Sequence, residues 1–247
     1  MKGRVVPAPA TFHVVVTCEH AAAAIPRKFG DLGLPAAVRA SHRAYDAGAL
    51  GIAKAIAKAL QAPLHVGAWS RLVVDLNRSH DQPAVIPRRV DGRPIAGNQV
   101  DGLARKQRVL EYWMPYRMAA TADIAAASHR GVVLHLSVHS FTPTLRGVVR
   151  RNDIGLLHDP ERALEVAFCN QLRSPLVEAG LVVRRNFPYF GNTDGFTSHL
   201  RQRLPAGRYL GIEIECNQRL VGKAPGARRA ARALVDALRR VVSPVAW

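Results

Sequence analysis

The sequence predicts an α/β fold in which helices cover both faces of a mixed, largely parallel sheet, giving a three-layer α/β/α sandwich. Short β-branched apolar runs recur along the chain, as in strands that are buried on both faces. Amphipathic helical segments alternate with these runs. No repeat, low-complexity tract or polar linker divides the 247 residues, of which 48% are hydrophobic and 21% charged. We therefore expect a single domain over residues 1–247 with one large core.

The first half of the chain predicts three strands and two helices. Residues 13–17, HVVVT, form a short apolar run that is typical of a buried strand. Residues 46–60 predict a helix, because isoleucine and leucine recur at intervals of four along one face. The other elements expected here are strands at 64–69 and 72–76, a Pro- and Arg-rich loop at 81–97, and a helix at 102–127 bent at Pro115.

The second half continues the alternation. Residues 132–138, VVLHLSV, predict the next strand. Residues 226–242 predict an amphipathic helix, with alanine, leucine and valine on one face and mainly arginine on the other. A helix at 161–180 and strands at 181–184 and 209–215 complete the predicted elements.

The charge balance is strongly basic. With 35 Lys and Arg against 18 Asp and Glu, the formal charge is +17, which would attract nucleic acid, an anionic membrane surface or a small acidic substrate. The sequence contains no helix-turn-helix, zinc-finger or aromatic-basic RNA motif. We therefore expect a small anionic substrate and no nucleic-acid partner, and keep a basic nucleic-acid-binding protein as the alternative.

Membrane and secretion signals are weak. No apolar run reaches the roughly 18 to 20 residues of a membrane-spanning helix. The N-terminal MKGRVVPAPATF has no sustained apolar segment of the kind found in signal peptides. Cys18, Cys169 and Cys216 are an odd set without Cys-x-x-Cys spacing, which favours reduced, buried thiols. We expect a soluble cytoplasmic protein without a membrane partner.

Polar residues follow the predicted strands at the point where each strand ends. They are Glu19 and His20, His139 and Ser140, Glu215 and Asn217, and the group Asp75, Asn77, Arg78 and Ser79. In open α/β sheets, ligands bind beyond the carboxyl ends of the strands. We therefore expect these side chains to form one site.

Two histidines and a carboxylate, with one position open to water, form a catalytic zinc site. His20 and His139 are the expected imidazole ligands. The third ligand is Asp46 or Glu19; we prefer Asp46, which could equally cap the helix that follows it. His135 shares a face with His139 but lies further from the strand end, so we interpret it as a hydrogen-bonded core histidine or a support for a ligand.

A metal-dependent hydrolase also needs a carboxylate that takes a proton from water. Glu213 and Glu215 share a face of their strand, and Glu215 is nearer the end, so we prefer Glu215 as the base. Guanidinium groups bind carboxylates in a two-pronged geometry. The expected substrate-binding residues are Arg71, which would hold the oxyanion, with Asn77, Arg78, Ser140, Arg201 and Asn217.

A set of motifs in a fixed order resembles the N-formylglutamate amidohydrolase family over about Val14 to Leu220. The motifs are VTCEHA, YDAGA, SRLVVDLNRS, YWMPY, LHLSVHSF, NFPYFGNTDGFTSHLR and GIEIECNQ. The resemblance implies a zinc carboxypeptidase-like fold, one zinc ion, and hydrolysis of N-formylglutamate to formate and glutamate in histidine degradation. It also implies that His20 and His139 are ligands, that Glu215 is catalytic, and that Asn77 and Arg78 grip a carboxylate.

Two departures from the family pattern concern the substrate. The family's PYH segment reads PYR here, with Arg117, and the loop after His20 is rich in alanine where glycine is frequent in the family. Both leave the acyl group and the amino acid open. A related zinc amidase or carboxypeptidase that acts on another N-acyl amino acid or a peptide is therefore the second alternative.

Overall fold

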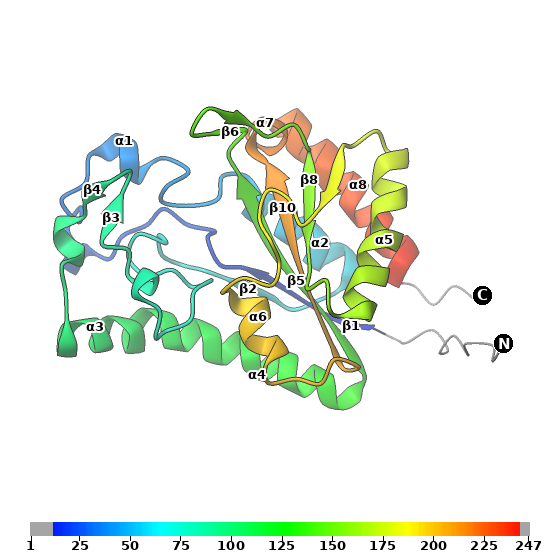
Figure 1. Ribbon diagram of the computed structural model, residues 1–247, viewed down its shortest axis with the longest axis horizontal. Helices are drawn as coiled ribbons and strands as arrows, with labels where there is room; N and C mark the ends of the chain where they lie inside the picture. Colours follow the sequence, from blue (N-terminus) through cyan, green and yellow to red (C-terminus); the bar gives the residue numbers. More distant parts are fainter. Residues whose placement is uncertain (1–11, 243–247) are drawn as a thin grey trace.

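The computed structural model describes residues 12–242, so the expectation about a leader falls almost entirely outside the described residues. A six-stranded sheet runs through the centre of the molecule in the order β2-β1-β5-β10-β8-β9 (Figure 1). Its strands are β1 (Phe12–Cys18), β2 (Leu64–Val66), β5 (Val132–Phe141), β8 (Ile154–Leu157), β9 (Val183–Arg185) and β10 (Tyr209–Asn217). Strands β2, β1, β5 and β10 are mutually parallel, whereas β8 is antiparallel to β10. The predicted mixed, largely parallel sheet is confirmed.

Helices cover both faces of this sheet, which confirms the three-layer prediction (Figure 1). One face packs on α2 (Ala49–Leu60), α5 (Ala163–Glu178) and α8 (Ala224–Val242) through an extensive apolar core. The other face packs on α4 (Met114–Arg130) and α6 (Phe196–Arg201) through a smaller core. Because side chains alternate along a strand, His135, Ser137 and His139 share the second face with Val133.

The long helix expected at 102–127 consists of three consecutive pieces. Helix α3 (Gly102–Arg108) leads into a π-helical turn at Val109–Trp113, and α4 then begins with Pro115 in its first turn. Proline is tolerated in a first turn because its missing N–H has no helical partner there. Pro115 therefore follows directly after the π-helical turn that interrupts the predicted helix, and the bend there stays a prediction.

One assignment from the sequence is wrong, and one strand of the sheet was not predicted. Residues 72–76 form buried turns and no strand, because their backbone bonds to surrounding loops and side chains; Asn98 Nδ2, for example, donates to the Leu72 carbonyl at 2.7 Å. Strand β8, which the sequence analysis did not identify, pairs with β10 in the antiparallel sense. The apolar composition of residues 72–76 correctly indicates burial, but it does not determine the hydrogen-bond partners of their backbone.

Small elements surround the carboxyl end of the sheet. They include α1 (Ala36–Arg39), α7 (Gln218–Val221), the hairpin of β3 (Arg89–Val90) with β4 (Arg93–Pro94), and the hairpin of β6 (Thr144–Leu145) with β7 (Val148–Val149). Three cysteines are buried and unpaired, as predicted. Among the described helices, none combines the length and apolar composition needed to cross a bilayer.

Candidate metal centre and active site

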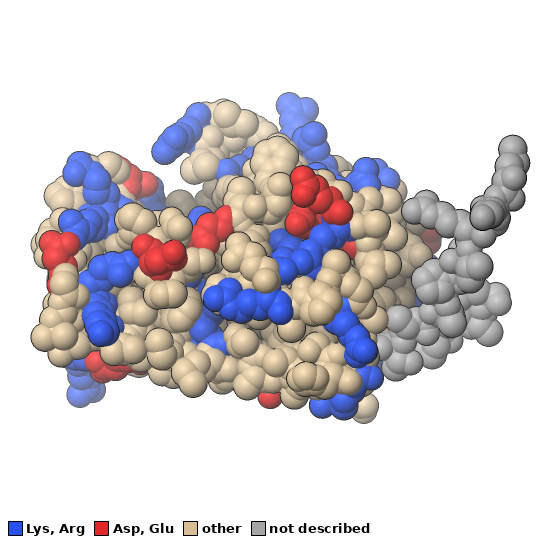
Figure 2. Space-filling view, turned by 60° about the horizontal axis from the view of Figure 1, so that its bottom comes forward, with Lys and Arg blue, Asp and Glu red and all other residues tan. Residues whose placement is uncertain are grey.

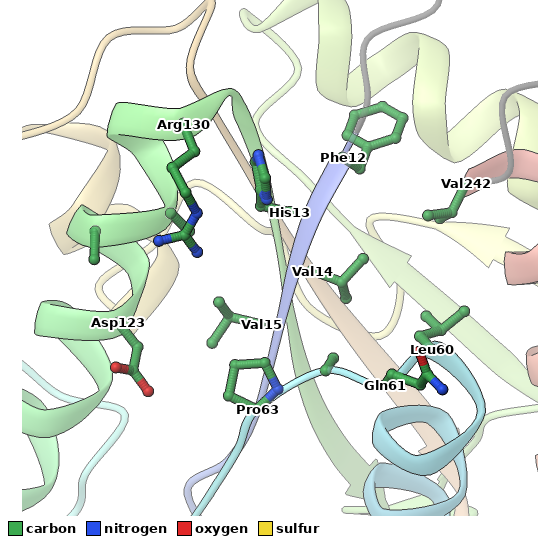
Figure 3. Close-up of a pocket in the computed structure, with 13 residues that line it drawn as sticks. Phe12, His13, Val14, Val15, Leu60, Gln61, Pro63, Asp123, Arg130 and Val242 are labelled. Carbon is green, nitrogen blue, oxygen red and sulfur yellow. The ribbon is translucent and has the colours of Figure 1, made fainter.

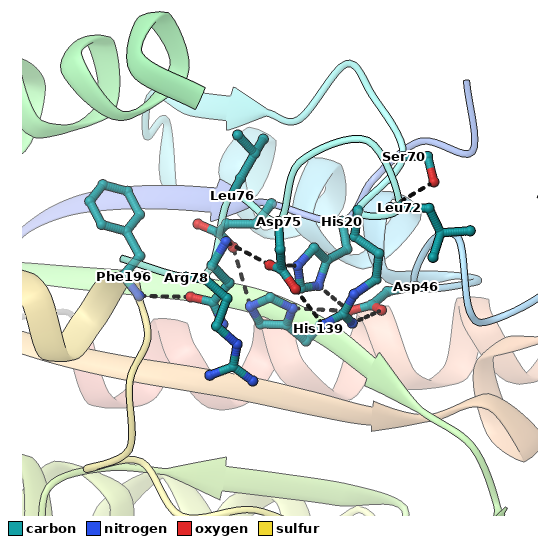
Figure 4. A network of polar contacts seen from close by, with 12 residues as sticks. His20, Asp46, Ser70, Leu72, Asp75, Leu76, Arg78, His139 and Phe196 are labelled. Carbon is teal, nitrogen blue, oxygen red and sulfur yellow. Dashed lines mark hydrogen bonds and ion pairs between the residues drawn. The ribbon is translucent and has the colours of Figure 1, made fainter. Parts of the chain in front are cut away.

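His20, Asp46 and His139 converge beyond the carboxyl end of β1 and beside that of β5 (Figure 4). One potential ligand atom from each lies within 4.8 Å of the others, and all three side chains are buried. Asp46 Oδ2 lies 3.4 Å from Nδ1 of His20 and 2.9 Å from Nδ1 of His139. The centroids of the two imidazole rings are 5.0 Å apart. Asp46 directs its side chain to the histidines, and Gly48, whose φ is +84°, occupies the N-cap of α2.

The opposite nitrogen of each ring contacts a second carboxylate. Nε2 of His20 lies 2.7 Å from Asp75 Oδ1. Nε2 of His139 lies 3.2 Å from Glu19 Oε2 and 2.9 Å from the Ser137 hydroxyl. Metal-binding histidines commonly donate their second N–H to a carboxylate in this way. The structure therefore places Asp46 between the two Nδ1 atoms and Glu19 behind one ring.

This donor set fits a divalent metal ion. Two imidazole nitrogens and one carboxylate oxygen are a ligand set of catalytic zinc sites, and here all three groups are buried and oriented by neighbours. The residues that would hold the ion are His20, Asp46 and His139, whereas Asp75 and Glu19 would hold the rings.

The charges of the cluster depend on one another. Burial would raise the pKa of Asp46, but the adjacent imidazoles outweigh burial and hold that pKa well below its usual range. Burial would lower the pKa of His139, but hydrogen bonds to Asp46 and Glu19 outweigh it and raise the pKa well above its usual value. The pKa of His20 is also raised, since Asp75 and Asp46 outweigh burial and the nearby Arg71. The buried carboxylates thus favour the protonated form of both imidazoles.

Arg71 connects the two aspartates of the cluster. Its Nη2 donates to Asp75 Oδ2 at 2.8 Å, and its Nη1 lies 3.6 Å from Asp46 Oδ1. Sequence reasoning placed Asp75 in the site without giving it a role. The available signal was its position in the sequence, because Asp75 is a buried carboxylate two residues before Asn77 and three before Arg78.

The pairing of β10 with β5 distinguishes the two candidate bases. Glu215 lies opposite His139, and Glu213 lies opposite Ser137. Glu215 Oε2 is buried and has no hydrogen-bond partner among the described residues, and burial raises the pKa of this carboxyl to about 7. Glu213 Oε1 instead accepts a hydrogen bond from the Thr197 hydroxyl at 2.7 Å. Glu215 is thus the free carboxyl next to the histidines.

A pocket of about 420 Å³ opens beside the cluster. Asp46, Arg71, Asp75, Arg78 and Ser140 all line it. Ser140 donates its backbone N–H to Asp46 Oδ2 at 3.2 Å and its hydroxyl to the Ala47 carbonyl at 2.8 Å. Its side chain therefore supports the position of the Asp46 loop.

Arg78 and Asn77 lie next to each other but bond differently. Arg78 lines the pocket and donates Nη1 to the Asp194 carbonyl at 2.5 Å. Asn77 Oδ1 accepts the backbone N–H of Phe196 at 2.7 Å, the contact drawn beside Phe196 in Figure 4. Arg78 thus presents its guanidinium to the pocket, while the Asn77 carbonyl oxygen binds the start of α6.

Two residues expected to bind substrate have structural contacts instead. Arg201 is buried and donates to Glu165 Oε1 at 3.0 Å and to the carbonyls of Gly191 and Gly211. Asn217 is fully buried, donates to the carbonyls of Arg150 and Asn152, and caps α7 through the N–H of Arg219. Neither Arg201 nor Asn217 lines the pocket. A position near a strand end did not reveal that both side chains turn into the protein.

His135 is a core histidine, as the sequence analysis expected. Its Nε2 lies 2.8 Å from the Thr17 hydroxyl, and its Nδ1 lies 2.7 Å from the Tyr209 hydroxyl. Burial lowers its pKa to about 3, so the ring is neutral. Both ring nitrogens are therefore occupied by hydroxyl groups.

Basic side chains are dispersed over the face shown in Figure 2. There, Lys and Arg form separate patches with uncharged and acidic surface between them. A backbone-tracking nucleic-acid site usually appears as a continuous basic stripe. The pocket beside the histidines, by contrast, brings four arginines and three aspartates into one concave region: Arg43, Arg71, Arg78 and Arg89 with Asp46, Asp75 and Asp91.

Known proteins match nearly the whole chain. The family model described as N-formylglutamate amidohydrolase matches residues 12–221. The crystal structure of gene product Atu2144 from Agrobacterium tumefaciens has a TM-score of 0.83 and 33% identity, covering 95% of this chain and 92% of that one. The N-formylglutamate amidohydrolase from Ralstonia eutropha JMP134 has a TM-score of 0.77 and 21% identity, covering 94% and 93%. Among curated protein sequences, none matches this chain.

Proposed function

The chain belongs to the N-formylglutamate amidohydrolase family, and from this premise we propose that it cleaves the N-formyl amide of glutamate or a similar acidic amino acid, with one divalent metal ion, zinc by preference. One observation carries the proposal. The buried His20–Asp46–His139 cluster lies next to Glu215, a carboxyl whose Oε2 has no partner among residues 12–242. A metal ligand set beside a free base is the combination that metal-dependent amide hydrolysis uses.

The metal would be held by His20, His139 and Asp46, with Asp75 and Glu19 fixing the rings. When bound, a divalent ion polarises an amide carbonyl and lowers the pKa of a water molecule. Zinc fits the nitrogen-rich, buried donor set better than magnesium or calcium, which prefer oxygen ligands.

Glu215 moves the proton in the proposed reaction. Its Oε2 accepts a proton from the attacking water, whose oxygen bonds to the formyl carbon. The same carboxyl then returns the proton to the amide nitrogen as the carbon–nitrogen bond breaks, so that formate and the free amino acid leave. A carboxyl with its pKa raised by burial to about 7 is suited to both transfers near neutral pH.

The arginines of the pocket favour an acidic substrate. Arg71 contacts both aspartates of the cluster, and we assign it to stabilise the carbonyl oxygen that becomes negative. Arg78 keeps 37% of its side chain exposed and faces the same pocket, where it is placed to bind a carboxylate. We assign Arg78 to a carboxylate of the amino-acid product.

The unpaired cysteines favour a reducing compartment, so we propose a cytoplasmic enzyme. The resemblance of the motifs to the family also supports a role in histidine degradation.

The test is a substrate panel on protein stripped of metal and reloaded with zinc. Formate release is measured with N-formyl-L-glutamate and N-formyl-L-leucine, and release of a free amino group with these two, N-acetyl-L-glutamate and a dipeptide; the metal-free protein is the control. We expect formate release that requires metal and is fastest with N-formyl-L-glutamate. Absence of formate release from every formyl substrate would refute the proposal, and faster cleavage of the acetyl compound or the dipeptide would favour the alternative amidase or carboxypeptidase activity.

A further inference from the structure

Arg117 is a buried cation that contacts the backbone of the Asn77–Arg78 segment. It lies in α4, and its side chain is 2% exposed. Its Nη1 donates to the Leu76 carbonyl at 3.0 Å and lies 3.4 Å from the Arg78 carbonyl. Within residues 12–242, no ion pair joins Arg117 to a carboxylate, and its Nε and Nη2 have no hydrogen-bond partner. The hydrogen bonds of Arg117 are thus directed to this one segment.

Two aromatic rings hold the Arg117 guanidinium in place. Its central carbon lies 3.9 Å from the centroid of the Phe196 ring and 4.7 Å from that of Trp113. Cations stack favourably on aromatic faces at such distances. Trp113 also donates its Nε1–H to the Arg78 carbonyl at 2.9 Å. The carbonyl of Arg78 is therefore fixed by Trp113 and, more weakly, by Arg117.

The segment before α6 fixes the same pair from the other side. The Phe196 N–H bonds to the Asn77 side chain, and the Asp194 carbonyl accepts from Arg78 Nη1. Asp194 also binds Ser79 through its carboxylate, at 2.6 Å from the hydroxyl. Arg117 therefore joins α4, the start of α6 and the backbone that carries Arg78.

We propose that Arg117 is a positioning residue that sets the direction of Arg78 towards the carboxylate of the substrate. It acts through Arg78, because it does not line the pocket and does not reach the metal ligands. A planar guanidinium can stack between two rings while one edge donates to carbonyls, as Arg117 does here. The inference rests on the proposed function for the identity of the bound carboxylate.

The test compares Arg117→His, Arg117→Lys and Arg117→Met in zinc-loaded protein with N-formyl-L-glutamate. Loss of hydrogen bonds to a charged group corresponds to roughly 10- to 100-fold in affinity. We expect KM to rise about 10-fold or more in the His and Met variants, less in the Lys variant, with kcat within about twofold and zinc affinity unchanged. A purely structural role would instead lower kcat, zinc affinity and the yield of folded protein together, and that outcome would overturn the proposal.

A second measurement tests whether Arg117 acts through Arg78. In the Arg78→Ala background, Arg117→His is expected to leave KM unchanged, because the group that it positions is already absent. An equal rise of KM in both backgrounds would overturn the proposal. Calorimetric binding of glutarate, a dicarboxylate without an amide, separates this inference from the proposed function. If no formyl substrate releases formate, the proposed function fails. If Arg117→His changes neither the KM of the substrate nor the Kd of glutarate, the positioning role fails.

Discussion

Strand β1 has a pocket at each end, and the two pockets differ in how their charges are arranged. The pocket at its amino end is the larger, about 530 Å³, and is lined by His13, Asp123 and Arg130 among mainly apolar side chains (Figure 3). The pocket at its carboxyl end, about 420 Å³, likewise contains histidine, aspartate and arginine. Residue types and volume therefore do not distinguish the two ends.

Burial and mutual contact do distinguish them. In the larger pocket, the Asp123 side chain is 52% exposed and pairs with His65 of β2, so solvent screens the interaction. At the carboxyl end, the side chains of His20 and Asp75 are 3% and 8% exposed and touch at 2.7 Å. Parallel strands bring β1, β5 and β10 to one edge, and charged groups buried there shift one another's pKa. A candidate site is thus better identified by convergent, desolvated charges than by size.

The largest effect that the comparison predicts is at Glu215. We expect Glu215→Gln to retain zinc and reduce kcat about 10³-fold, because general acid–base groups contribute about 10²- to 10⁴-fold. The matched control is Glu213→Gln, which keeps an acceptor for Thr197 and is expected to reduce kcat less than about tenfold. Steady-state kinetics with metal analysis of each variant would decide between them. A larger loss from Glu213→Gln would assign the base to Glu213.

The raised pKa of Glu215 also predicts a pH dependence of stability in the metal-free protein. Folding raises this pKa from 4.5 to about 7, so the folded state holds the proton more tightly than the unfolded state. The free energy of unfolding therefore falls as pH rises from about 4.5 to 7, by at most about 3 kcal/mol from this group. Urea unfolding of wild type and Glu215→Gln should show the variant gaining relative stability over that range.

The exposed Glu161 provides the control for this measurement. Glu161→Gln is expected to change the free energy of unfolding by less than about 0.5 kcal/mol at any pH, as surface substitutions usually do. If wild type and Glu215→Gln differ by a constant amount from pH 4.5 to 8, Glu215 does not titrate in the way its burial implies.

The next effect compares a buried histidine–aspartate pair with an exposed one. Asp75→Asn is expected to weaken zinc binding about 10- to 100-fold, because loss of a carboxylate behind a ligand histidine commonly has this effect. Asp123→Asn, which changes the contact to His65 at 3.0 Å, should leave zinc affinity unchanged. Competition titration with a chelating dye measures both. Equal losses in the two variants would show that the contrast between the buried and the exposed pair is irrelevant to metal binding.

The sequence predicted which side chains of the candidate site converge, because polar residues directly after an apolar run mark the end of a strand. His20, Asp46, His139 and Glu215 come from segments far apart in the chain, yet parallel strands oblige their carboxyl ends to meet. The choice of Glu215 over Glu213 followed from distance to the strand end, and the register opposite His139 gives the physical reason.

What the sequence could not provide is the direction of individual side chains. Arg201 and Asn217 lie in the expected segments but turn into the protein, where backbone carbonyls accept their donors. The same limit hid the contact of Asp75 with His20, and it made residues 72–76 look like a strand. Burial is encoded in composition, whereas the partner of each polar group depends on tertiary neighbours.

The smallest expected effect lies at the amino end, and it tests the comparison from the opposite direction. Arg130 is an exposed side chain in the larger pocket, where it points from α4 in Figure 3. Because its charge is solvated and lies at the opposite end of β1 from the histidines, Arg130→Ala should leave kcat/KM within about twofold and zinc affinity unchanged. Arg78→Ala, which removes one cation from the smaller pocket, should raise KM at least tenfold in the same assay. If Arg130→Ala raised KM as much as Arg78→Ala, the amino-end pocket would contribute to substrate binding. Pocket volume would then identify the site better than buried, convergent charges do.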